Sequence, residues 1–110
     1  MDELLERIKK LEYHQKLLLE MIQPVNKDFD LLIIKNGLAE KEVKEFHLLC
    51  EELLDEMERQ KAENFVFHSP LFKQFTAMLN RKLEPRETIQ ACLKQNIHPK
   101  LMKVLWLNIR

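Results

Sequence analysis

The sequence predicts an all-α protein, a multihelical bundle of five to six helices in a single domain. Three observations predict this fold. The chain has 110 residues, the usual size of one domain, and no linker or low-complexity segment divides it. It contains one glycine, too few for hairpin turns, β-bulges or phosphate-binding loops. Apolar residues recur at helical spacing through most of the chain.

A long N-terminal helix is predicted over residues 3–23, with Asp2 as N-cap and Pro24 at its end. Its apolar residues alternate in steps of four and three, the heptad spacing of a coiled coil. Leucine occupies the d positions and isoleucine the a positions, apart from one glutamine, a polar residue of the kind that fixes register. The predicted oligomer interface consists of Leu4, Ile8, Leu11, Gln15, Leu18 and Ile22.

Two interpretations of this apolar stripe stay open. It packs either against a second copy of the chain or against the rest of its own domain, since three heptads are only just enough for a coiled coil. The helix becomes apolar on almost every side near its end, which favours burial by another subunit. Isoleucine at a with leucine at d favours two parallel strands, whereas Gln15 and the apolar end leave a trimer open. We therefore predict a homo-oligomer, dimer or trimer, assembled through residues 1–23, with residues 24–110 as the helical body.

Two helices are predicted in the first half of the body. Residues 29–36 form a short helix with Asp28 as cap, and Gly37 suits the left-handed conformation that ends a helix. Residues 40–63 form a long helix with a strongly acidic outer face. The apolar stripe of this long helix contains Val43, Phe46, Cys50, Leu53 and Met57.

The second half of the body is predicted to begin with an extended segment over residues 65–67. Ser69 as N-cap and Pro70 as first helical residue then open a helical unit that runs to Pro85. Further helices cover residues 86–95 and the segment that begins at Pro99. The apolar face of the unit before Pro85 contains Leu71, Phe72, Phe75, Met78 and Leu79.

Charge divides the chain into an acidic and a basic part. The whole chain is neutral, but residues 1–64 carry 10 Lys or Arg against 16 Asp or Glu, and residues 65–110 carry 8 against 2. We favour attraction between the two parts, within one subunit or between subunits. The alternative is a nucleic-acid-binding oligomer that uses the basic part, which overall neutrality disfavours because phosphate binding needs uncompensated positive charge.

Localisation is predicted to be cytoplasmic. The longest run without a charged residue is residues 64–72, far short of the roughly 20 apolar residues of a membrane span. The acidic N-terminal segment lacks the apolar region of a secretory signal. Two cysteines are too few for a disulfide framework, so reduced thiols are expected.

No catalytic, cofactor-binding or metal-ligating residue is predicted. His47 and Cys50 stand three apart on one helix, but a zinc site needs three or four ligands, and the other histidines are isolated in sequence. Cys92 is expected in the core and Ser69 as a cap, so neither is a candidate nucleophile. We predict a non-enzymatic protein that acts through protein–protein interaction, regulatory or otherwise. Its predicted partners are copies of itself, and another protein is an additional candidate.

Three stretches carry a family resemblance: residues 7–13 (RIKKLEY), 60–66 (QKAENFV) and 79–89 (LNRKLEPRETI). They resemble the YhaI-like family of small uncharacterised proteins from Bacillus-type bacteria, and the resemblance covers the whole chain. It implies an all-helical, self-associating cytosolic protein and supplies no catalytic or binding residues. The family favours glycine where this chain has Asn64 and Asn96, and asparagine also tolerates the left-handed conformation.

Overall fold

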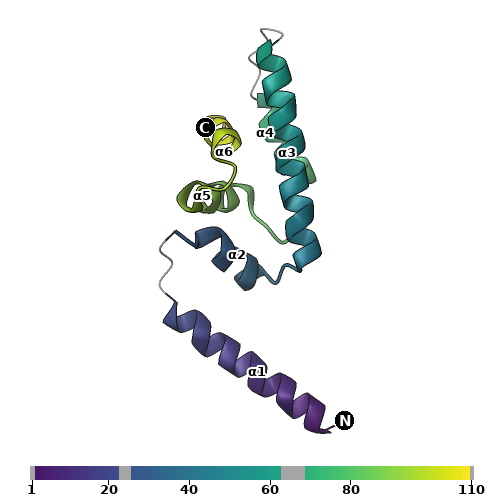
Figure 1. The fold of residues 1–110 in the computed structure, drawn as a ribbon, viewed down its shortest axis with the longest axis vertical. Coiled ribbons are helices and arrows are strands. Elements are labelled where there is room, and N and C mark those ends of the chain that lie inside the picture. Colours follow the sequence, from purple (N-terminus) through teal and green to yellow (C-terminus); the bar gives the residue numbers. More distant parts are fainter. Residues whose placement is uncertain (1, 23–25, 63–68, 110) are drawn as a thin grey trace.

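The computed structural model describes residues 2–22, 26–62 and 69–109, and it confirms the all-α prediction. Over these residues the chain forms six helices and no strand. α1 lies at one end of an elongated molecule of 62 × 29 × 19 Å, and α2 lies between it and the remaining helices (Figure 1). The helices are α1 (Asp2–Met21), α2 (Asp28–Asn36), α3 (Glu40–Ala62), α4 (Ser69–Met78), α5 (Pro85–Gln95) and α6 (Pro99–Leu107).

The predicted helix starts are confirmed within one residue, but three predicted caps are wrong. Ser69 is the first residue of α4 rather than its cap. Asp2 and Asp28 are likewise the first residues of α1 and α2. Lys27 precedes α2, and its side chain makes no capping hydrogen bond. The acidic side chains still lie in the first turn of each helix, where they interact favourably with the positive end of the helix dipole.

The predicted length of the helical unit before Pro85 is wrong, because α4 ends at Met78. A turn follows, in which Asn80 Oδ1 accepts a hydrogen bond from the backbone N–H of Lys82 at 2.9 Å. Asparagine favours turns for this reason, because its side chain replaces a backbone acceptor. The predicted extended segment at residues 65–67 and the predicted helix ends at residues 23 and 63 lie outside the described residues.

Two helix ends of the body share one left-handed design. Gly37 (φ 69°) ends α2 and Asn96 (φ 61°) ends α5. In both cases the next N–H reaches back across the last turn, from Leu38 to the Ile33 carbonyl and from Ile97 to the Cys92 carbonyl. The predictions at both positions are therefore confirmed. Asn96 adopts the left-handed conformation that glycine adopts more often.

The core lies within the body and is built by α2 to α6. α5 packs between α2 and α6, while α3 packs against α4 and α6. The predicted stripe of α3 is confirmed, since four of its five residues are buried and Val43 is half-buried. Met78 was predicted on an apolar face but is 63% exposed, because α4 ends there. The largest fully buried side chains include Phe29, Met57, Leu71, Phe75, Ile89, Leu101, Met102 and Leu105.

Candidate functional site

Five of the six predicted interface residues lie on one face of α1, and Ile22 directly follows the last residue of that helix. All six are exposed, and the exposed fractions of the five apolar ones run from 43% for Ile8 to 65% for Leu11. α1 contains no buried residue at all. The described part of the body therefore does not cover this face, which disfavours the interpretation that the stripe packs on its own domain. A continuous exposed apolar face of this length is typical of an interaction surface.

The apolar surface of α1 is wider than the predicted stripe. Leu5, Leu17 and Met21 are also exposed, and Met21 is the most exposed large apolar residue described, at 76%. Met21 and Leu17 flank Leu18 and Ile22 on one side of the stripe, while the half-buried Leu19 flanks it on the other. The broad apolar region is therefore concentrated in the C-terminal half of α1.

α1 gains little stability from the rest of its own subunit. A helix of 20 residues without tertiary burial is marginal in water, because nucleation is costly and each residue adds little. None of the four ion pairs in the described part of the chain involves an α1 residue. Packing against another molecule would supply the missing stabilisation.

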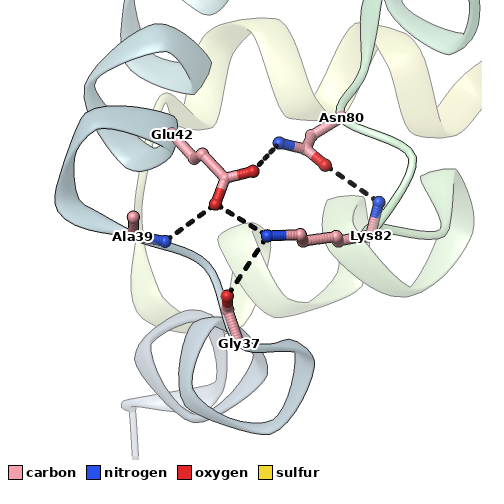
Figure 2. A network of polar contacts seen from close by, with 5 residues as sticks. All are labelled: Gly37, Ala39, Glu42, Asn80 and Lys82. Atoms are coloured by element: carbon pink, nitrogen blue, oxygen red, sulfur yellow. Dashed lines mark hydrogen bonds and ion pairs between the residues drawn. The ribbon is translucent and has the colours of Figure 1, made fainter.

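A polar network fixes the start of α3 against the turn after α4 (Figure 2). The Glu42 carboxylate accepts hydrogen bonds from the Ala39 backbone N–H at 2.9 Å, from Asn80 Nδ2 at 2.7 Å and from Lys82 Nζ at 2.9 Å. Lys82 Nζ also approaches the Gly37 carbonyl at 3.4 Å. Three hydrogen bonds lower the pKa of Glu42 to about 2. The bond from Ala39 has the largest effect, followed by those from Asn80 and Lys82. The network ties the α2–α3 corner to the second half of the body, so its role is structural.

A histidine pair is the main polar feature that sequence reasoning missed. His47 Nδ1 on α3 lies 2.8 Å from His98 Nε2, which immediately precedes α6. His98 has a left-handed backbone (φ 46°), and its side chain contacts His47 instead of capping α6. Burial lowers the pKa of His98, and His47 lowers it further, while Glu51 acts in the opposite direction. One ring donates the hydrogen bond and the other accepts it, and the tautomers of the two rings decide which is the donor.

The histidine pair belongs to an aromatic cluster that joins α2, α3 and α4. Phe46 lies 5.0 Å from Phe29 and 6.3 Å from Phe75, measured between ring centroids. His47 borders a shallow apolar groove of about 280 Å³ beside this cluster. The groove is lined by Phe29, Asp30, Ile33, Ile34, Val43, His47 and Ile97.

The cysteines fit the core role that the sequence predicts. Cys50 and Cys92 are free and fully buried. Burial raises the pKa of both thiols, that of Cys92 to about 12, so both stay protonated at neutral pH. A buried, protonated thiol is a poor nucleophile and a poor metal ligand.

Ion pairs join the acidic and basic parts of the chain within one subunit. Lys82 Nζ lies 2.9 Å from Glu42 Oε1, and Lys94 Nζ lies 3.8 Å from Asp28 Oδ2. α2 and α5 are further connected where the Asp30 backbone N–H donates to Gln95 Oε1 at 3.0 Å. These contacts agree with the favoured interpretation, attraction between the two parts, and they compensate two of the basic side chains.

Two further properties of the described residues bear on function. They contain no group of three or more His, Cys, Asp or Glu side chains arranged to hold a metal ion. Nor does any helix in residues 2–22, 26–62 or 69–109 combine the length and apolar character that a membrane crossing requires.

Comparison with known protein families assigns the chain to a family. The family model described as "Protein of unknown function (DUF1878)" matches residues 1–110, the whole sequence. The chain belongs to this family. DUF1878 carries no assigned activity in its description, so function has to be argued from the geometry of this member.

Proposed function

We propose that this DUF1878 protein is a small, non-enzymatic interaction protein that self-associates as a dimer or trimer through α1. The observation that carries the proposal is the contrast between a well-formed heptad stripe and the exposure of all its residues, on a helix with no fully buried residue. Apolar residues at a and d positions are the usual means by which helices of separate chains associate. Another protein with a matching helix is a further candidate partner for the same face.

The finer parts of the proposal follow from the same features. Two free thiols favour a reducing, cytoplasmic environment. Both cysteines are buried and protonated, which favours a role without catalysis by these groups. Within DUF1878, the resemblance to the YhaI-like proteins stays a prediction.

Light scattering behind size exclusion tests the proposal on the wild type and two variants of the full chain. The wild type should elute as a dimer or trimer, and Leu11→Asp should elute as a monomer, because a carboxylate cannot be buried in the centre of the stripe without a large cost. Tyr13→Asp is the matched control, since Tyr13 is exposed on the opposite face of α1 and the change in charge is the same. A monomeric wild type, or a Leu11→Asp variant with the mass of the wild type, would overturn the proposal.

The alternative function is nucleic-acid binding through the basic part of the chain. Lys100 and Lys103 on α6 and Arg81 after α4 are exposed, whereas Lys82 and Lys94 are engaged in ion pairs. The remaining positive charge is modest, which makes this the weaker candidate. Retention on immobilised DNA or RNA that falls steeply with salt would support the alternative, and absence of retention at low salt would reject it.

A further inference from the structure

The charged residues that flank the apolar stripe of α1 distinguish parallel from antiparallel pairing. Arg7 and Glu12 lie on opposite flanks, at heptad positions g and e, where Leu4, Leu11 and Leu18 are d. Both are exposed, and neither takes part in an ion pair among the described residues. Resting on the proposed self-association, we infer that the partner of α1 is α1 of a second copy, lying parallel and in register.

Parallel pairing joins opposite charges. In a parallel coiled coil a g residue lies beside the e residue five positions later on the other helix. Arg7 therefore lies beside the partner's Glu12, and the symmetry of the pair repeats the contact on the other side. An antiparallel pair that matches the same apolar residues places Glu12 opposite the partner's Glu12, and Arg7 opposite the partner's Met21. Like charges directly across an interface disfavour that arrangement.

The polar layer in the middle of the stripe favours the same orientation. In a parallel pair Gln15 faces the partner's Gln15, so one side-chain amide donates to the carbonyl of the other. In an antiparallel pair each Gln15 faces a Leu11, which buries two amides without polar partners. The antiparallel pair does gain contacts between Leu5 and the partner's Leu19. These contacts lie at the edge of the seam, where burial is incomplete, and they return less than the unpaired amides cost.

Disulfide cross-linking of Leu4→Cys reads the orientation directly. Parallel helices in register place the two new thiols beside each other, whereas antiparallel helices separate them by about 27 Å, since 18 residues at 1.5 Å each lie between the two positions. The native Cys50 and Cys92 are fully buried, so the wild type serves as an uncross-linked control. With oxidised glutathione, Leu4→Cys should form a covalent dimer within minutes. A mixture of Leu4→Cys and Ile22→Cys should give no disulfide between the two variants.

Charge reversal tests the flanking contacts independently. Arg7→Glu and Glu12→Arg should each raise the dissociation constant of the assembly by about tenfold, because attraction becomes repulsion at every Arg7–Glu12 contact. Mixing the two variants in equal amounts should restore association, since each mixed contact again joins opposite charges. Lys9→Glu and Glu6→Arg, which make the same charge changes on the outer face, should leave association unchanged. Antiparallel pairing would leave each variant alone near the wild-type value, because Arg7 then lies opposite Met21 and the two residues at position 12 still carry like charges. Single variants that associate as tightly as the wild type would therefore overturn the parallel arrangement.

The outcomes separate this inference from the proposed function. A wild type that is monomeric by light scattering overturns both. An oligomeric wild type in which the thiols at positions 4 and 22 cross-link with each other overturns the parallel arrangement alone. An oligomer in which neither combination cross-links shows that α1 docks elsewhere on the second copy, and it too overturns the inference while the self-association stands.

Discussion

α1 and α3 are the two long helices of the molecule, with 20 and 23 residues, and both carry apolar residues in alternating steps of three and four. The stripe of α3 is buried, and Leu53 in its middle is 4% exposed. The stripe of α1 is open to solvent, and Leu11 in its middle is 65% exposed. The same apolar spacing therefore packs against other described helices in α3 and against none of them in α1. Spacing identifies the face that needs burial, and tertiary structure alone shows what covers it.

The two helices also differ in the source of their stability. α3 packs against α4 and α6, and its first turn is held by the Glu42 network. α1 has no fully buried residue and no ion pair among the described residues. The body should therefore fold without α1, whereas α1 should depend on another molecule for a stable helix.

The largest expected effect is the difference between matched truncations in the two stripes. Leu53→Ala should lower the free energy of unfolding of the body by about 2–5 kcal/mol, since it removes a buried side chain and leaves a cavity. Leu11→Ala should change it by less than about 0.5 kcal/mol, because an exposed side chain loses little on truncation. Urea titration followed by the fluorescence of Trp106, the single tryptophan, measures both. Similar losses in the two variants would mean that α1 belongs to the same folding unit.

A smaller effect is expected at the start of α5, where the side chain of Glu84 caps the helix. The Glu84 carboxylate accepts hydrogen bonds from the backbone N–H groups of Arg86 at 3.2 Å and Glu87 at 2.7 Å. Glu84→Ala should cost about 1 kcal/mol of unfolding free energy in the same titration. Glu87→Ala, with the same loss of charge in the first turn of the helix but no capping hydrogen bond, should cost clearly less. Equal effects would show that charge near the helix end matters rather than the cap.

The smallest effect expected is the pH dependence that comes from Glu42. The pKa of Glu42 is lowered to about 2 in the folded state from an ordinary value of 4.5, so the folded protein binds the proton less readily than the unfolded chain. The stabilisation is present above pH 4.5 and is lost as pH falls towards 2. Wild type should be more stable than Glu42→Gln at pH 6, and the difference should shrink between pH 4.5 and 2. Glu45→Gln, a neighbour with no hydrogen bond among the described residues, should show no such trend.

Much of the fold was accessible from sequence because local chemistry sets it. Gly37 and Asn96 end their helices as predicted, since few residues adopt the left-handed conformation that both positions require. The end of α4 was not predicted because it depends on the turn that follows. In this turn the Asn80 side chain accepts a hydrogen bond from the backbone N–H of Lys82, and the helix does not continue. Patterns of apolar residues do not record such a side-chain hydrogen bond.

Parts of the molecule built from distant residues could not be predicted in this way. The residues of the α1 face were predicted together because they lie within 19 positions on one helix. His98 is isolated in sequence, yet its Nε2 lies 2.8 Å from His47 Nδ1, because the α5–α6 turn carries His98 onto α3. The left-handed conformation of His98 gives no sequence signal, since a residue before proline normally adopts an extended conformation.

Hydrogen exchange of α1 and α3 over a dilution series tests the central claim most directly. The account predicts that α1 amides are protected at high protein concentration and lose their protection on dilution, at the concentration where light scattering detects dissociation. The amides of α3 should keep their protection throughout, because their cover lies within the subunit. Protection of α1 that stays equal to that of α3 in the dissociated monomer would contradict the account.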